Sequence, residues 1–242
     1  HHLQPIVYQE KIYVMGALTG KYPGETPIPN IYIYHPAEDR WEKSTAIPTD
    51  RQRGAAGVAL YKGKMYMACG IRDGHRGDHK KWLDVFDPAS AKWETLPDAP
   101  RARDHFQAIA AKDQLFLLGG RTTIAADNPF KNTITEVDVY NFKTGQWKTL
   151  EQGLPTQRAG NYASLVGNEI LVMGGESFFQ EASHAETEAI NVSTLQWRSL
   201  APMLQGRHGT GAVLHQGKIY VASGSGNRGG GPELITLEYF EF

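Results

Sequence analysis

Four arginines recur along the chain at nearly equal intervals, and a pair of small residues follows each of them 16 and 17 residues later. In the order Arg53, Arg103, Arg158 and Arg207, the arginines are 50, 55 and 49 residues apart. A guanidinium group offers a planar fork of donors that suits a carboxylate or a sulfate. A repeat of this length usually marks one structural unit stacked several times, so the four arginines are expected to meet in space.

A second set of residues could carry acid–base chemistry. Asp104 directly precedes His105, and a neighbouring carboxylate raises the pKa of an imidazole and orients the ring. This pair is the strongest candidate for a catalytic base and the group that positions it. The complete set of catalytic candidates is His105, Asp104, Tyr162, Glu176 and His208.

Each unit of the repeat contains four short β-rich runs that would position these groups. The apolar run before each small pair, such as residues 115–118, follows another run, such as 108–110, and the two read as a hairpin. A third run, such as residues 83–88, precedes a fourth that carries Trp41, Trp93, Trp147 or Trp197. A fifth small pair, Gly16-Ala17, adds a unit at the start of the chain. The five units span approximately 1–50, 51–100, 101–156, 157–205 and 206–242, and the last one ends after its third strand.

The small pair, the Tyr-or-Phe/Asp/Pro turn and the Trp, each at its own offset, resemble the kelch repeat of the galactose-oxidase central-domain superfamily. The resemblance covers essentially the whole chain, although the pair departs from Gly-Gly in three units: Gly16-Ala17, Cys69-Gly70 and Ser223-Gly224. Kelch units form blades of a β-propeller. The resemblance therefore implies one all-β domain, 1–242, folded as a five-bladed propeller. Four antiparallel strands are expected per blade, with the last blade incomplete or closed by the N-terminus.

The resemblance also implies that the first strand of each unit is innermost. The repeat arginines and the long loops after the small pairs would then surround one mouth of the central channel, and variable loops on a fixed scaffold commonly form binding sites. The expected function is binding of an acidic or neutral sugar, or of a peptide or partner protein, at this mouth. The ligand-binding candidates are His2, Arg53, Arg103, His105, Arg121, Arg158, Glu176, Arg207, His208 and Arg228.

Two alternatives stay open at this stage. In kelch repeats the arginine can instead tie adjacent blades through backbone carbonyls or neighbouring carboxylates. Resemblance to kelch-type sialic acid epimerases, or to a uronate lyase with similar chemistry, implies instead a carbohydrate-active enzyme. In that enzyme Glu176, which directly follows a small pair, would be the acidic residue of the site, and Arg158 or Arg207 would bind a carboxylate of the substrate. Copper radical oxidases of the same superfamily need a Cys–Tyr cofactor, but the only cysteine, Cys69, lies in a small pair. No cofactor is expected.

The loop residues His75, Asp78 and His79 place metal-ligand types within five positions of one another. Such a set suits zinc or another divalent transition metal. Tight, solvated turns have the same composition, and the spacing matches no established metal motif, so the sequence predicts no metal.

Composition limits the partners. The formal net charge is −1 and no basic run exists, which argues against nucleic-acid binding through phosphates. No apolar stretch approaches the roughly 18 residues of a membrane span. A single cysteine excludes an internal disulfide. A monomer is expected, and the family resemblance favours a periplasmic or secreted protein although no signal peptide is visible.

Overall fold

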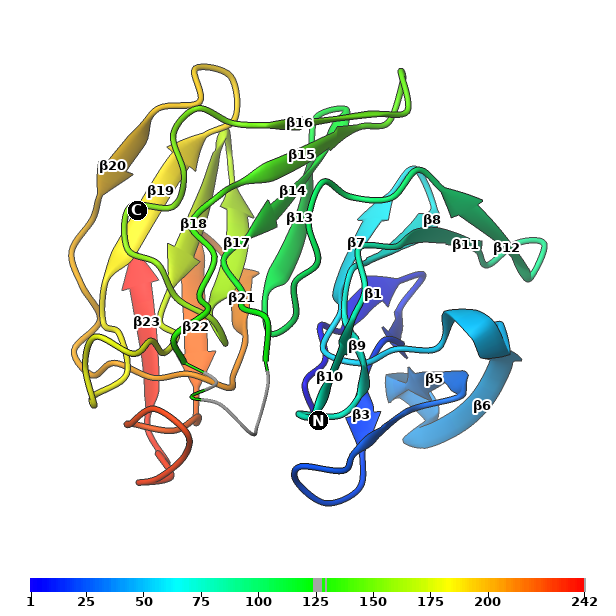
Figure 1. Ribbon diagram of the computed structural model, residues 1–242, viewed down its shortest axis with the longest axis horizontal. Coiled ribbons are helices and arrows are strands. Elements are labelled where there is room, and N and C mark those ends of the chain that lie inside the picture. The colour runs from blue at the N-terminus through cyan, green and yellow to red at the C-terminus, as the bar shows by residue number, and fades with distance from the viewer. Residues whose placement is uncertain (124–127, 129, 242) are drawn as a thin grey trace.

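A computed structural model describes residues 1–123, 128 and 130–241 of the chain, which form five antiparallel sheets (Figure 1). Blade 1 contains β1 (Ile6–Tyr8), β2 (Lys11–Val14), β5 (Asn30–His35) and β6 (Arg40–Ala46). Blade 2 contains β7 (Gly57–Tyr61), β8 (Lys64–Ala68), β11 (Leu83–Asp87) and β12 (Lys92–Leu96). Blade 3 contains β13 (Gln107–Ala111), β14 (Gln114–Leu118), β15 (Asp138–Asn141) and β16 (Gln146–Thr149). Blade 4 contains β17 (Tyr162–Val166), β18 (Glu169–Met173), β19 (Thr187–Asn191) and β20 (Trp197–Ser199), and blade 5 contains β21 (Ala212–His215), β22 (Lys218–Ala222) and β23 (Leu237–Glu241).

The loops after the small pairs extend two of the blades with short ribbons. β3 (Leu18–Thr19) pairs with β4 (Thr26–Pro27), and β9 (Ile71–Asp73) pairs with β10 (Gly77–His79). In Figure 1, β3, β9 and β10 lie on the same side of the molecule as the N-terminus. Two single-turn 3₁₀ helices, η1 (Pro36–Glu38) and η2 (Thr49–Arg51), join other segments. No helix among the described residues is long and apolar enough to cross a membrane.

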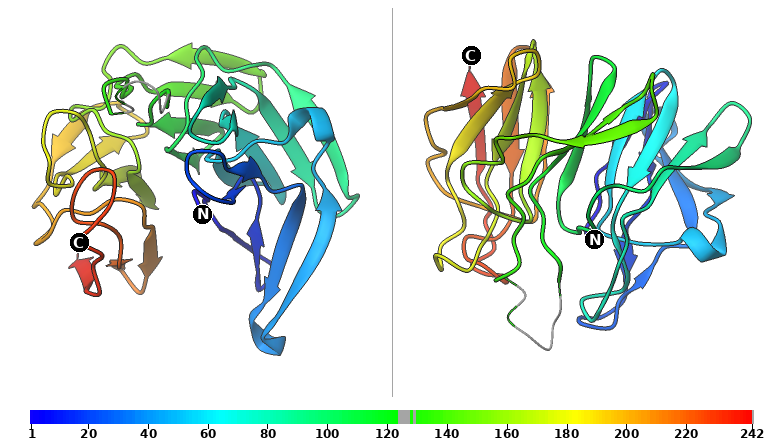
Figure 2. Two further views of the ribbon diagram at one scale, coloured as in Figure 1. Left: turned by 60° about the horizontal axis from the view of Figure 1, so that its bottom comes forward. Right: turned by 45° about the horizontal axis from the view of Figure 1, so that its top comes forward.

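The blades follow one another around a central axis. The inner strands β1, β7, β13, β17 and β21 each contact the next in this order, and Figure 2 (left) shows an arc that stays open between the first and last blades. Within the described part of the chain β23 pairs with β22 alone, whereas β1 pairs with β2 in blade 1. The predicted five-bladed propeller is confirmed, and its last blade takes the incomplete, three-stranded form.

Four apolar clusters fill the spaces between consecutive blades. One joins Tyr13 and Ile33 of blade 1 to Val58 and Met67 of blade 2, and equivalent clusters join blades 2 and 3, 3 and 4, and 4 and 5. A single blade cannot bury both faces of its sheet, so each gains its core by stacking on its neighbours.

The small pair is required by a sharp turn at the end of each second strand. Its second residue has a φ of +107° at Gly70, +99° at Gly120, +105° at Gly175 and +93° at Gly224. A Cβ at any of these glycines would lie 2.7 or 2.8 Å from the carbonyl oxygen of the residue that follows the repeat arginine. Glycine alone combines this backbone conformation with so close an approach.

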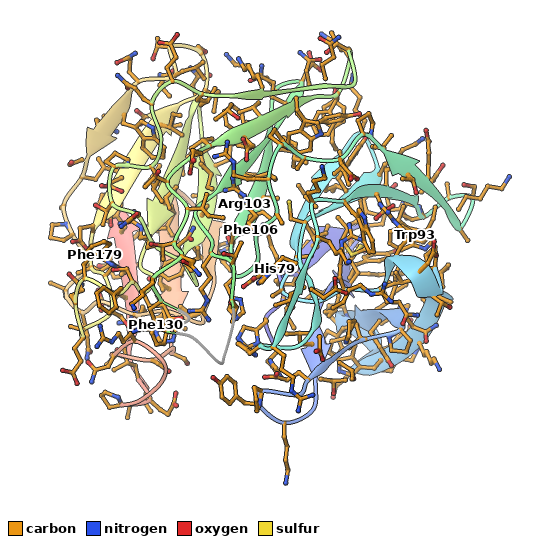
Figure 3. All side chains as sticks on the ribbon, in the orientation of Figure 1. His79, Trp93, Arg103, Phe106, Phe130 and Phe179 are labelled. Atoms are coloured by element: carbon orange, nitrogen blue, oxygen red, sulfur yellow. The ribbon has the colours of Figure 1, made fainter. Side chains whose placement is uncertain are left out.

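The fourth-strand tryptophans tie consecutive blades together. Trp93 of β12 donates its indole N–H to the carbonyl of Ala46 in blade 1 at 3.0 Å, and Trp147 of β16 donates to Pro97 in blade 2 at 2.8 Å. Trp93 lies towards the outer edge of its blade in Figure 3. Trp93 and Trp147 therefore have a structural role at the rim of the propeller, whereas the indole nitrogen of Trp197 has no hydrogen-bond partner among the described residues.

Candidate functional site

The four repeat arginines lie inside the blades and do not line the mouth. All four have 0% exposure, and Figure 3 shows Arg103 in the interior. Each guanidinium pairs with a carboxylate on the third strand of its own blade, namely Arg53 with Asp84 (2.7 Å), Arg103 with Asp138 (2.6 Å), Arg158 with Glu188 (2.8 Å), and Arg207 with Glu238. Each also donates to backbone carbonyls at the end of the second strand. The structure does not place them against a ligand at the mouth, because the guanidinium groups are buried and their bonds tie strands within one blade.

The residue two positions after each repeat arginine faces the axis. Ala55, His105, Gly160 and Gly209 occupy this place, and all have left-handed backbones, with φ from +49° to +67°. The N–H of His105 donates to the Ala55 carbonyl at 3.2 Å, Gly160 to His105 at 2.7 Å, and Gly209 to Gly160 at 3.3 Å. Backbone hydrogen bonds thus link blades 2, 3, 4 and 5 around the axis, and His105 is one of the linked residues.

Asp104 and His105 begin a buried polar network at the mouth. The Nδ1 atom of His105 contacts Asp104 Oδ1, and Asp104 also accepts from the backbone N–H and the hydroxyl of Thr123 at 3.0 and 2.6 Å. His79, from the end of β10, places Nε2 at 3.3 Å from Asp104 Oδ2 and 2.6 Å from the Thr123 carbonyl. The carboxylate of Asp104, just before β13, therefore contacts both the β9–β10 ribbon and the loop that carries Thr123.

Arg121, Glu176 and His208 extend the network across blades 3, 4 and 5. Arg121 Nη1 lies 2.7 Å from Glu176 Oε1, and His208 Nε2 lies 3.4 Å from Glu176 Oε2. Gly229 donates its backbone N–H to the same Oε2 atom at 2.7 Å. Burial alone would raise the pKa of Glu176, but the charges of Arg121 and His208 outweigh it and lower this pKa. The charged groups on this side of the mouth are thus already paired with one another.

Protonation at the Asp104–His105 pair differs from the sequence expectation. Burial and the charge of Arg121 lower the pKa of His105 to about 4, although Asp104 acts in the opposite direction. Burial opposes ionisation of Asp104, but contacts with His105, Arg121 and Thr123 outweigh it and lower the pKa to about 2. At neutral pH the pair is therefore an ionised carboxylate and a neutral imidazole, and this imidazole is a weaker base than a free histidine.

Three histidines converge beside this pair. His75, in the turn between β9 and β10, places Nε2 at 3.1 Å from His105 Nε2. The ring centroid of His2 lies 4.3 Å from that of His105 and 5.0 Å from that of His75. On its other side, Nδ1 of His75 lies 2.9 Å from Oε1 of the buried Glu25. The proposed set His75, Asp78 and His79 does not converge: Asp78 is exposed and pairs with Lys80 at 2.5 Å.

An aromatic and cationic rim surrounds Phe130 on the same side of the molecule, where Figure 3 places Phe130 at the lower edge. The guanidinium carbon of Arg228 lies 6.0 Å from the ring centroid of Phe130 and 5.9 Å from that of Phe178. Lys131 Nζ lies 5.7 Å from the Phe178 centroid, and Phe179 is 68% exposed. The sequence predicted Arg228 here but missed the three phenylalanines and Lys131, because these loops share no repeat register.

Comparison with known proteins agrees with this architecture. The kelch motif matches residues 158–204. The chain is 28% identical to "Kelch-like protein terF" of Aspergillus terreus, covering 93% of this chain and 49% of that protein, and 27% identical to "Alpha-scruin" of Limulus polyphemus, covering 81% and 21%. The solved "Structure of YjhT" superimposes with a TM-score of 0.80 at 14% identity, covering 99% of this chain and 81% of that one. The chain carries a kelch motif and folds as a five-bladed β-propeller. It spans about half the length, or less, of these curated relatives.

Two groups with chemical potential lie inside this kelch propeller. Tyr162 is fully buried in blade 4 and donates its hydroxyl to Met203 Sδ at 2.8 Å, so it does not reach the mouth as a base. Ser177, His184 and Glu186 follow the order nucleophile, base and acid, with 2.8 Å from Ser177 Oγ to His184 Nε2 and 3.0 Å from His184 Nδ1 to Glu186 Oε2. Because Ser177 has no exposed surface, this trio ties its loop and offers no hydroxyl to a substrate.

Proposed function

We propose that this kelch propeller is a binding module whose loop face recognises an acidic carbohydrate at the rim formed by Phe130, Phe178, Phe179, Lys131 and Arg228. One observation carries the proposal: exposed aromatic rings stand beside cations that have no carboxylate partner. Ligand sites commonly combine aromatic surface with a few placed polar groups. Arg also suits a carboxylate or sulfate through paired hydrogen bonds.

The charge distribution favours this rim over the centre of the mouth. The repeat arginines are paired inside the blades, and Arg121 is paired with Glu176. Among the described residues, no carboxylate lies within ion-pair distance of Arg228 or Lys131. The Phe178 carbonyl accepts from Arg228 Nη1 at 2.8 Å and holds the side chain in place. An anionic group arriving here would meet a preorganised guanidinium whose Nη1 atom also donates to the Gln180 carbonyl at 3.5 Å and whose Nε and Nη2 atoms have no hydrogen-bond partner among the described residues.

Titration calorimetry with glucuronate, galacturonate, a sialate and neutral hexoses tests this proposal. We expect an acidic sugar to bind at least about tenfold more tightly than its neutral counterpart, a difference of about 1.4 kcal/mol. Arg228→Gln should remove that preference, and added salt should weaken it. The matched control is Arg198→Gln, because Arg198 is exposed on β20 and paired with Glu169 at 2.6 Å. Equal binding of neutral sugars, or an unchanged affinity in Arg228→Gln, would contradict the proposal.

A carbohydrate-active enzyme at the same mouth is less well supported. It would rely on Asp104 and His105 as the oriented base, but the low pKa of His105 weakens it as a base near neutral pH. Its Nε2 atom also faces His75 and not an open space. The geometry therefore supports binding better than catalysis.

A further inference from the structure

The convergence of His2, His75 and His105 brings together three imidazoles from segments far apart in the sequence. One nitrogen from each ring lies within 4.8 Å of those of the other two. The segments belong to the N-terminus, the β9–β10 turn and the start of blade 3. His75 and His105 are buried, whereas His2 is more exposed. Across the described residues, no other three His, Cys, Asp or Glu side chains gather so closely.

The outer nitrogens of two of these rings are held by carboxylates. Glu25 Oε1 lies 2.9 Å from His75 Nδ1, and Asp104 Oδ1 contacts His105 Nδ1. The hydrogen bond to Asp104 places a hydrogen on Nδ1 of His105 and leaves the lone pair of its neutral ring on Nε2, whereas Nδ1 of His75 lies close to Glu25 without a hydrogen bond. The two Nε2 atoms face each other at 3.1 Å. A carboxylate behind each ring is the arrangement that orients metal-binding histidines and increases their basicity.

The separation of the nitrogens suits a metal ion. Two nitrogens bound to one tetrahedral zinc at about 2.0–2.1 Å lie about 3.4 Å apart, close to the observed 3.1 Å between His75 and His105. One ring nitrogen of His2 lies within 4.8 Å of the nitrogens of His75 and His105. The nearby charge of Arg121 is offset by Glu176 at 2.7 Å. Glu25 and Asp104 supply two negative charges against the two positive charges of the ion.

The backbone supplies an independent observation. His2 and His105 occupy the same place in the repeat, with φ of +55° and +52°, where blade 2 has Ala55 at +49° and blades 4 and 5 have Gly160 and Gly209, so the conformation is common to this position. A left-handed backbone costs a non-glycine residue about 1–2 kcal/mol. Strained backbones of this kind cluster at functional sites. The two strained histidines are two of the three that meet at the axis.

We propose that His2, His75 and His105 bind one divalent transition-metal ion of the zinc type, with Glu25 and Asp104 orienting His75 and His105. Three imidazoles leave a fourth coordination position open, as in zinc sites that bind an exogenous ligand. The site lies beside the sugar-binding rim and does not depend on it. It would give this face of the propeller a second class of ligand, namely an anion or water bound to the metal.

The test is titration of chelator-stripped protein with Zn²⁺, and with Co²⁺ followed by visible absorption. We expect one ion per chain and a Co²⁺ spectrum of low coordination number. His75→Asn and His105→Asn should each weaken Zn²⁺ binding at least tenfold, because asparagine accepts the same backbone conformation but is a poor zinc ligand. Glu25→Gln should weaken it about 10–100-fold through its effect on His75. Thermal unfolding of the metal-free variants checks that each is folded.

Two control variants separate this site from adventitious binding. His215→Ala removes an exposed histidine on β21 and should leave the affinity unchanged. His1→Ala removes the ring that contacts His2 from outside the cluster and should also retain binding. The proposal is overturned if no single-ion binding is found, or if binding survives in both His75→Asn and His105→Asn. Loss in His1→Ala with retention in His105→Asn would likewise overturn it, since the exposed pair would then be the ligand.

Discussion

Replacing Arg103 with leucine should lower the free energy of unfolding by about 3–5 kcal/mol, the cost of breaking a buried ion pair from one side, although Asp138 keeps contacts with Arg101 and Thr149. Arg103 and Asp138 both have 0% exposure, and Arg103 Nη2 lies 2.6 Å from Asp138 Oδ2. The guanidinium also donates to the carbonyls of Gly119 at 2.8 Å and Glu136 at 3.1 Å. One substitution would therefore leave a buried carboxylate and two carbonyls without these donors. Chemical denaturation followed by tryptophan fluorescence measures the loss.

Two further variants separate burial from the loss of an arginine. Arg198→Leu removes a guanidinium from an exposed pair with Glu169 and should cost no more than about 1 kcal/mol. Arg103→Leu combined with Asp138→Leu should be more stable than Arg103→Leu alone, because the buried carboxylate that has lost its fully buried partner is removed as well. An Arg103→Leu protein within about 1 kcal/mol of the parent protein would show that the pair does not hold the blade together.

Replacing Gly120 with alanine should destabilise the propeller by about 2–4 kcal/mol through backbone strain and steric overlap. The φ of Gly120 is +99°, and a Cβ there would lie 2.8 Å from the Asp104 carbonyl oxygen and 2.9 Å from the Phe106 Cβ. Both neighbours belong to the segment that carries His105. The same substitution should therefore also weaken Zn²⁺ binding if the metal site is as proposed. Denaturation and Zn²⁺ titration of one preparation measure both effects.

Two glycines elsewhere provide matched controls. Gly167 has a φ of +56° and nothing within 4 Å of an added Cβ, so Gly167→Ala isolates the conformational cost of about 1–2 kcal/mol. Gly211 has neither constraint, and Gly211→Ala should change stability by no more than about 0.5 kcal/mol. If Gly120→Ala and Gly167→Ala lower the free energy of unfolding by the same amount, the close approach of the Asp104 carbonyl contributes nothing to the loss in Gly120→Ala.

The structural role of the arginines could have been recognised from the sequence. Carboxylates follow the four arginines after 31, 35, 30 and 31 residues, at Asp84, Asp138, Glu188 and Glu238. This recurrence matches the third strand of each blade, where the ion pairs form. A repeated arginine with a repeated acid indicates an ion pair within the unit, whereas a ligand site would need arginines without such partners.

The three-histidine cluster carries no comparable sequence signal. His2 and His105 share a position in the repeat, but His75 comes from the turn between β9 and β10, which lies outside the repeated four-strand pattern. Loops that differ in length and composition have no common register, so their meeting points cannot be read from periodicity. The rim around Phe130 and Phe178 was missed for the same reason.

The sequence by itself determined the number of blades, their four-stranded pattern and the places of the small pairs and tryptophans, whereas the structure decided that the last sheet has three strands. These features arise from local patterns repeated five times, and each repeat stacks on the next in the same way. Only the tertiary structure decided which side chains face the axis. That choice depends on partners from other segments, such as Asp138 for Arg103 and Glu25 for His75. A buried charge or imidazole takes the orientation in which distant groups satisfy it, and the chain brings those groups together only on folding.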